Sequence, residues 1–275
     1  MQLHLANSIL DLSCPKVMGI VNVTPDSFSD GGRHLSTDAA IAHAFQLLEE
    51  GADILDIGGE STRPGAVPVS EQEELDRVLP VIEGLRQISQ PISIDTTKHA
   101  VMRAALLAGA SWVNDVNALQ EAGALAVVAS SGAAVCLMHK QGTPETMQNA
   151  PIYADVMAEV MHFLQQRISA CIVAGVTKER IVIDPGFGFG KSLAHNVSLL
   201  KNLQQFATLG VPILAGLSRK SMLGALTGRA VNERLTVSVA AALIAVQNGA
   251  QIVRVHDVQA TVDALKIWNA VNEGK

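Results

Sequence analysis

The 275-residue chain has few aromatic residues, at 3%, and few charged residues, at 17%. Its core must therefore be built from Ala, Val, Leu and Ile, as buried parallel strands and their covering helices require. The net charge of −6 argues against binding of duplex nucleic acid, because neutralising phosphates requires a basic face. Hydrophobic residues make up 48% of the chain, which excludes general disorder.

Cysteine is scarce as well, and Cys14, Cys136 and Cys171 have neither the even number nor the spacing of a disulfide framework. The first ten residues lack the basic and apolar regions of a secretory signal. No window offers the ~18 uninterrupted apolar residues of a membrane span. These absences predict a cytoplasmic protein that has neither a membrane nor a nucleic acid as its partner.

Short β-branched apolar runs alternate with stretches of helical periodicity along nearly the whole chain. This alternation implies parallel strands with right-handed crossovers, and eight such units favour a closed (β/α)8 TIM barrel of the α/β class. No linker is visible, so residues 1–275 are expected to form a single domain with a barrel core at about residues 16–271. Strands are predicted at 17–23, 54–57, 92–94, 112–116, 134–138, 181–183, 211–215 and 252–255, and helices at 39–50, 71–87, 98–108, 156–173 and 236–248.

Polar side chains cluster where these apolar runs end. In a barrel the C-terminal strand ends converge on one face, where active sites are built. The pattern therefore predicts one functional site. Its residues at the strand ends are Asn22, Glu60, Ser61, Thr62, Arg63, Asp95, Asn114, His139, Asp184, Ser218, Arg219, Lys220, Arg254 and His256.

Asp95, Asn114 and Asp184 bring hydrogen-bond acceptors into otherwise apolar strands. Burying a carboxylate costs several kcal/mol unless it is paired or accepts hydrogen bonds. Each residue alone could belong to a structural ion pair or cap, and nearby strands offer Lys220 and Arg254 as cations. The three acceptors together favour a ligand edge with adjacent N–H donors, such as a 2-aminopyrimidinone.

Two turn-rich loops follow the first two strands. Residues 22–32 contain Phe28, which has no obvious core to fill, and residues 58–65 combine glycines with a hydroxyl and Arg63. The second loop suits phosphate binding, although an ordinary turn with a solvated arginine is the alternative.

Lys220 could be solvated, could form a Schiff base as in barrel aldolases, or could contact an anion. The neighbouring Arg219 and Arg254 favour the anion. The glycine-rich segment 184–191 matches neither a dinucleotide fingerprint nor a Walker A sequence. His139 and His256 lack the spacing of a zinc site.

The segments NVTPDSFSDGG, GGESTRPG, DPGFGFGK, SRKS and RVHDV, in this order, resemble those of the dihydropteroate synthase family. The likeness extends from about residue 17 to residue 258, and the chain departs from the pattern at Lys140 and at residues 236–238. It implies a homodimeric transferase that joins 6-hydroxymethyl-7,8-dihydropterin diphosphate to 4-aminobenzoate with release of pyrophosphate. It also implies Mg²⁺ on the diphosphate and sulfonamides as inhibitors.

The resemblance also assigns roles to residues. Asp95, Asn114, Val116, Met138, Asp184, Lys220 and Arg254 are expected to bind the pterin. Asn22, through the metal, and Thr62, Arg63, Arg254 and His256 are expected to hold the diphosphate. Phe28, Arg63, Pro64, Phe187, Lys220 and Ser221 are expected around the aminobenzoate, and Asp30, Asp95, Asp184, Lys220 and Arg254 are the expected catalytic residues.

Two alternative functions share the same barrel and acidic pocket. One is a pterin-binding methyltransferase domain, which moves a methyl group to a corrinoid, although the chain has no cobalamin domain. The other is a non-catalytic paralogue that binds pterin. For the synthase, we expect dissociative C–O cleavage, because an electron-rich dihydropterin can share the positive charge left when the diphosphate departs.

Overall fold

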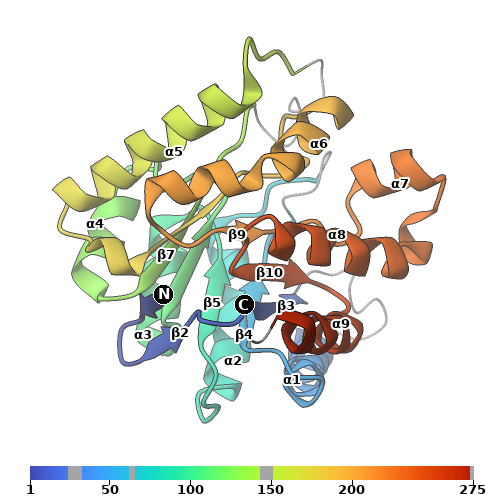
Figure 1. The fold of residues 1–275 in the computed structure, drawn as a ribbon. Helices are drawn as coiled ribbons and strands as arrows, with labels where there is room; N and C mark the ends of the chain where they lie inside the picture. The colour runs from blue at the N-terminus through green and yellow to red at the C-terminus, as the bar shows by residue number, and fades with distance from the viewer. Residues whose placement is uncertain (24–32, 62–65, 143–150, 273–275) are drawn as a thin grey trace.

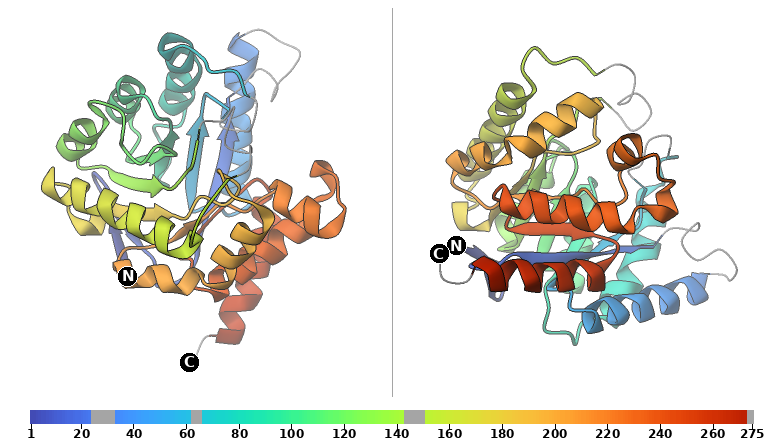
Figure 2. Two further views of the ribbon diagram at one scale, coloured as in Figure 1. Left: turned by 90° about the horizontal axis from the view of Figure 1, so that it is seen from above. Right: turned by 45° about the vertical axis from the view of Figure 1, so that its right-hand side comes forward.

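The computed structural model describes residues 1–23, 33–61, 66–142 and 151–272. Its centre is a sheet of eight parallel strands with helices packed around it (Figure 1). The strand order is β8-β7-β6-β5-β4-β3-β10-β9, and a parallel bridge between Ile183 and Ile213 joins the two edges. The predicted α/β barrel is therefore confirmed, and the two views in Figure 2 show the same arrangement of strands inside and helices outside.

The barrel strands are β3 (Lys16–Asn22), β4 (Ile54–Gly58), β5 (Ile92–Asp95), β6 (Trp112–Asp115), β7 (Ala134–Met138), β8 (Ile181–Asp184), β9 (Leu214–Ala215) and β10 (Ile252–Val255). The α-helices are α1 (Arg33–Glu49), α2 (Glu71–Gly84), α3 (His99–Ala108), α4 (Ala124–Ser131), α5 (Val156–Val173), α6 (Leu193–Lys201), α7 (Ser221–Thr227), α8 (Leu235–Gln247) and α9 (Val258–Asn272). The 3₁₀ turns η2 (Lys178–Arg180), η3 (Leu203–Leu209) and η4 (Val231–Glu233) complete the connections. No helix in these described parts of the chain has the length and apolar character needed to cross a membrane.

Alternate side chains of the barrel strands enter two different apolar clusters, as the two-residue period of a strand requires. Val113 of β6 packs in the cluster that includes the helices. Trp112 of the same strand belongs to a second cluster, which contains Leu3, Leu5 and Leu12 from around the N-terminal hairpin. That antiparallel hairpin, β1 (Gln2–His4) and β2 (Ile9–Asp11), was not predicted, and it covers the barrel interior near the strand starts.

The seventh barrel strand is shorter than the predicted run 211–215. Pro212 has no backbone N–H to contribute to a ladder. The N–H of Ile213 donates to Oε1 of Gln251, at 2.8 Å, instead of to a neighbouring strand. At β9 the barrel is therefore closed by few backbone pairings: a strand of two residues and one bridge between Ile183 and Ile213.

Candidate active site

A cavity of about 430 Å³ lies at the C-terminal ends of the barrel strands. This volume is typical of small-ligand sites. The structure brings ten of the residues with expected binding roles to the cavity wall: Asn22, Asp95, Asn114, Val116, Met138, Asp184, Lys220, Ser221, Arg254 and His256. Sequence reasoning did not assign Ile20, Gly188, Phe189, Gly216 and Val231, which also line it.

Several of the predicted contacts lie outside the described residues. These are Phe28, Asp30, Thr62, Arg63 and Pro64. Their expected roles remain predictions.

The segment after β8 places Phe189, and not Phe187, at the cavity wall. The ring of Phe187 is fully buried in the core, and only its carbonyl oxygen faces the site, where it accepts a hydrogen bond from Nζ of Lys220. Phe189 lines the cavity, and its ring centroid lies 4.6 Å from Nζ of Lys220. Gly186 and Gly188 have φ values of 73° and 80°, and these left-handed turns on either side of Phe187 redirect its side chain inward. The aromatic ring that lines the cavity is therefore that of Phe189, and the structure does not support the expected contact of the Phe187 ring with the aminobenzoate.

One wall of the cavity presents hydrogen-bond acceptors from neighbouring strands. Asp95 of β5 is the register partner of Asn114 of β6, and Asp184 of β8 is the partner of Met138 of β7. Oδ1 of Asp184 accepts from the N–H of Gly186 at 2.7 Å. Oδ1 of Asp95 is buried and has no hydrogen-bond partner among the described residues.

Burial dominates the electrostatics of this wall. It raises the pKa of Asp95 to about 7, even though the nearby Arg254 opposes the shift. Burial also raises the pKa of Asp184, against the opposing charge of Lys220. Desolvated carboxylates of this kind are stabilised by ligand donors.

The cation side of the cavity, in contact with these carboxylates, carries Arg254 and Lys220. Arg254 of β10 donates from Nε to Asp56 at 2.5 Å and from Nη2 to Asp95 at 2.7 Å. Burial lowers the pKa of Arg254, but the two carboxylates outweigh this effect and raise it. Burial lowers the pKa of Lys220 to about 8, with Asp184 opposing the shift. Asp95 therefore belongs to an ion pair, which was one of the alternatives left open for it.

Asp56 was not singled out from the sequence. It lies inside the apolar run of β4 rather than after its end, and its side chain is fully buried below the cavity. The sequence feature that could have revealed it is a carboxylate in the middle of an apolar strand, two residues before Gly58 and on the face that points into the barrel.

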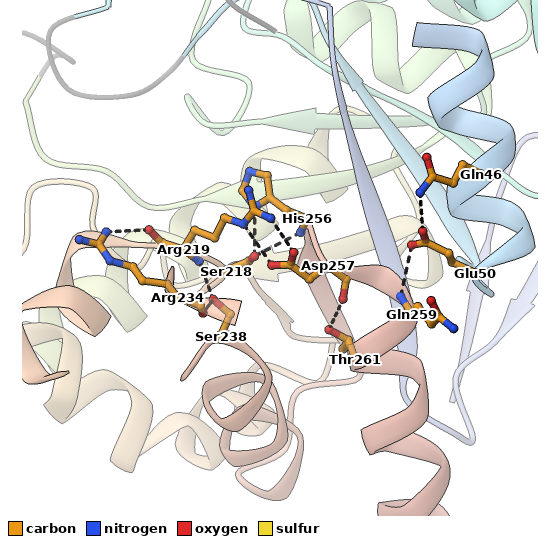
Figure 3. Close-up of polar contacts among 10 residues, drawn as sticks. All are labelled: Gln46, Glu50, Ser218, Arg219, Arg234, Ser238, His256, Asp257, Gln259 and Thr261. Atoms are coloured by element: carbon orange, nitrogen blue, oxygen red, sulfur yellow. Dashed lines mark hydrogen bonds and ion pairs between the residues drawn. The ribbon is translucent and has the colours of Figure 1, made fainter. Parts of the chain in front are cut away.

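The loop after β9 is held by Ser238 of α8, by Arg234 just before α8 and by Asp257 just after β10 (Figure 3). Arg219 has a left-handed φ of 58°, and its N–H donates to Oγ of Ser238 at 2.9 Å. Arg234 donates to the carbonyl of Arg219 at 3.0 Å. The guanidinium of Arg219 binds both oxygens of Asp257, at 3.1 and 2.6 Å. Although it lines the cavity, Arg219 is thus paired with Asp257.

The same loop contacts the predicted diphosphate residue His256. Oγ of Ser218 lies 3.0 Å from Nδ1 of His256 and accepts from the N–H of His256 at 3.2 Å. Figure 3 also shows a separate group in which Glu50, just after α1, accepts from Gln46 and from the N–H of Gln259 in α9. These contacts anchor the segment that carries His256 from both sides.

Lys191 and His139 form a buried pair behind the segment after β8. Nζ of Lys191 lies 2.9 Å from Nδ1 of His139 and donates to the carbonyls of Gly186 at 2.9 Å and Phe189 at 3.1 Å. Burial lowers the pKa of Lys191 to about 7 and that of His139 to about 3. His139 therefore supports this loop and does not line the cavity.

Comparison with known proteins agrees with this geometry. The model of a family described as pterin binding enzyme matches residues 18–256. The chain belongs to the pterin-binding enzyme family. A dihydropteroate synthase of Haemophilus influenzae is 54% identical over 271 residues, which cover 98% of each chain.

Solved structures of dihydropteroate synthases resemble the whole chain. The enzyme of Xanthomonas albilineans with 4-aminobenzoic acid is 57% identical, with a TM-score of 0.94 and coverage of 100% of this chain and 99% of the other. The Yersinia pestis enzyme in a sulfonamide drug complex is 51% identical, with a TM-score of 0.95 and full coverage of both chains. Within the pterin-binding family, the chain therefore groups with the dihydropteroate synthases.

Proposed function

We propose that the protein is a transferase of folate biosynthesis that catalyses the dihydropteroate synthase reaction. It joins 6-hydroxymethyl-7,8-dihydropterin diphosphate to 4-aminobenzoate and releases pyrophosphate and 7,8-dihydropteroate. One observation carries the proposal: a buried wall of acceptors faces Lys220 and Arg254 in a single cavity. A pterin supplies adjacent ring N–H and amino donors for Asp95, Asn114 and Asp184, and its flat ring suits the guanidinium of Arg254.

The leaving diphosphate fits the cavity side formed by Asn22, Arg254 and His256. No group of three or more His, Cys, Asp or Glu side chains with metal-ligand geometry occurs among the described residues. Asn22 offers a single neutral oxygen, which fits a Mg²⁺ ion held mainly by substrate phosphates and water. Bound there, Mg²⁺ would neutralise charge on the diphosphate.

The residues of the site favour C–O cleavage ahead of amine attack. Asp95 and Asp184 can stabilise a cationic dihydropterin, while Arg254 and His256 stabilise the negative charge that develops on the leaving group. Lys220 lies between Asp184 and Phe189 and can bridge the pterin and the aminobenzoate. An amine that attacks a cation loses its proton afterwards, so the mechanism requires no strong base.

The deciding experiment measures pyrophosphate release from the pterin diphosphate, with and without 4-aminobenzoate. Release that depends on the arylamine, with 7,8-dihydropteroate as product, is the expected result. Pterin binding without turnover would instead favour the non-catalytic paralogue. Methyl transfer from a methylated pterin to a corrinoid would favour the methyltransferase.

Positional isotope exchange tests the order of bond breaking. With ¹⁸O in the bridging position of the diphosphate and no aminobenzoate present, reversible cleavage scrambles the label. Scrambling is the expected result. A carbon isotope effect typical of concerted displacement would overturn the dissociative step.

We further propose a homodimer in which α7, α8 and α9 contribute to the contact. Large apolar side chains are exposed along this part of the chain: Leu226, Val231, Leu235, Ile244, Ile267 and Val271. Light scattering on a size-exclusion column tests this state, and the expected mass is twice that of the 28.9 kDa chain. Leu235→Glu with Ile267→Glu is expected to shift it to monomer.

Sulfonamide inhibition and a cytoplasmic location belong to the same proposal. A sulfonamide that mimics 4-aminobenzoate should compete with it, and the competition is measured by varying aminobenzoate at fixed inhibitor. The three free cysteines Cys14, Cys136 and Cys171 fit a reducing compartment. Fractionation of cells that express the protein tests the location.

A further inference from the structure

Asp56 is fully buried and is absent from the cavity wall, yet it contacts two residues that line the cavity. Its Oδ2 accepts from Nδ2 of Asn114 at 3.0 Å and from Nε of Arg254 at 2.5 Å. Its Oδ1 has no hydrogen-bond partner among the described residues. Burying a carboxylate costs free energy when one of its oxygens has no hydrogen-bond partner, and this cost calls for a functional explanation.

The contact with Asn114 decides which end of the amide faces the cavity. A carboxylate accepts hydrogen bonds, so the NH₂ group of Asn114 must point at Asp56. The carbonyl Oδ1 of Asn114 is then the end turned away from Asp56. A flipped amide would place a carbonyl against a carboxylate and would present an NH₂ group to the cavity.

The contact with Arg254 fixes a second group. Asp56 binds Nε while Asp95 binds Nη2, so two carboxylates from β4 and β5 hold one edge of the guanidinium. The orientation of the guanidinium plane of Arg254 is therefore determined by these two strand residues. Bidentate arrangements of this kind restrict the orientation of an arginine.

We infer that Asp56 is a positioning residue for pterin recognition, which orients the carbonyl of Asn114 and the guanidinium of Arg254 toward the ligand. The inference rests on the proposed function, because it explains why the cavity presents an acceptor at Asn114 to the donors of a pterin. Asp56 itself does not touch the ligand.

Four isosteric proteins test the inference: wild type, Asp56→Asn, Asn114→Asp and the double variant. The measured quantity is the affinity for 6-hydroxymethylpterin in the presence of pyrophosphate and Mg²⁺, by calorimetry. Asp56→Asn is expected to weaken binding several-fold, because the charge that holds Arg254 is lost. Asn114→Asp is expected to weaken binding at least tenfold, because two carboxylates then face each other across the 3.0 Å contact.

The double variant distinguishes a positioning role of Asp56 from a role limited to protein stability. In it, the amide introduced at position 56 can donate to the carboxylate introduced at position 114, so the pair keeps its charge and its hydrogen bond with donor and acceptor exchanged. Asp56→Asn is therefore expected to strengthen binding when it is combined with Asn114→Asp, and to weaken it when made alone. A role limited to stability changes the melting temperature and does not reverse the sign of an effect on affinity.

Ser93 supplies the matched control. It is the register partner of Asp56 in β5, is fully buried, and its hydroxyl has no partner among the described residues. Ser93→Ala should leave pterin affinity unchanged. Additive losses in the double variant, or equal losses in Ser93→Ala, would overturn the inference while the wild type still binds. A wild type that does not bind the pterin would overturn the proposed function and this inference together.

Discussion

The acceptor wall and the cation side of the cavity are built in different ways. Asp95, Asn114 and Asp184 are strand residues, and the parallel register alone brings the first two beside each other. Arg219, Lys220 and His256 follow strands. Ser238 of α8 and Arg234 bind the backbone of Arg219, and Ser218 accepts from the backbone N–H of His256. The acceptor wall is thus fixed by the sheet, as is Arg254 of β10, whereas Arg219 and His256 depend on hydrogen bonds and an ion pair made by loop side chains.

This difference leads to different expectations for substitutions on the two sides. A change at Asp184 on the acceptor wall should alter binding and leave the sheet in place, since the backbone ladder does not depend on that side chain. A change in the loops of the cation side should spread to neighbouring loop residues and alter turnover or KM. Substitutions on the two sides test this contrast.

Lys220→Ala should have the largest effect. Lys220 is half-buried between the acceptor wall and Phe189, and removing one preorganised electrostatic group lowers turnover by about 10²–10³-fold. Pyrophosphate binding, measured by calorimetry with Mg²⁺, should weaken much less than kcat falls. Equal losses in both quantities would place Lys220 in binding of the diphosphate instead.

Asp184→Asn tests the acceptor wall. The variant nearly preserves shape but can turn an NH₂ donor toward the donors of the pterin. Losing a hydrogen bond to a charged group costs roughly 1.5–3 kcal/mol, so pterin affinity should fall at least tenfold. The circular dichroism melt should remain cooperative. Unchanged pterin binding would remove Asp184 from the pterin site.

The same contrast explains what the sequence could predict. The alternation of β-branched apolar runs with helical stretches predicted the barrel, and polar residues at strand ends predicted the acceptor wall, because both follow from local sequence and parallel register. The pairing of Arg219 with Asp257 joins residues 38 positions apart and depends on tertiary packing. The inward turn of Phe187 required the φ values of its neighbouring glycines, and Asp56 was hidden within an apolar run.

The pH profile gives the next prediction. Burial lowers the pKa of Lys220 to about 8, so the ammonium is present below pH 8 and is lost above it. Since the charged form is needed at the site, kcat/KM should fall about tenfold by pH 9. Lys220→Arg should be less active but should lack this alkaline limb, because an arginine keeps its charge. An identical limb in that variant would assign the titration to another group.

Arg219 tests how strongly the cation side depends on its backbone conformation. Both Arg219→Gly and Arg219→Ala lose the ion pair with Asp257, and both should raise KM for the pterin diphosphate several-fold. Only Gly adopts the φ of 58° without a penalty, so the Ala variant should unfold about 1 kcal/mol more easily. Chemical denaturation measures this difference. Equal stability of the two variants would show that the loop relaxes when the arginine is removed.

The smallest effect on catalysis is expected at Lys191, which supports the cavity from behind. Its pKa is about 7 in the folded protein and 10.5 in an ordinary lysine, so between these values the unfolded chain binds more protons than the folded one. The free energy of unfolding should therefore gain a contribution that rises with pH from 7 to 10.5, by at most about 1.4 kcal/mol per pH unit. Lys191→Met removes that contribution.

The measurement is urea denaturation of wild type and Lys191→Met at several pH values from about 6 to about 10. The difference in unfolding free energy should be constant below pH 7 and should change steadily above it. His139 does not titrate in this range, because burial lowers its pKa to about 3. Lys201→Met, at the exposed end of α6, serves as the control and should give curves parallel to the wild type. Parallel curves for Lys191→Met would mean that its amine stays charged in the folded protein, held by the carbonyls of Gly186 and Phe189.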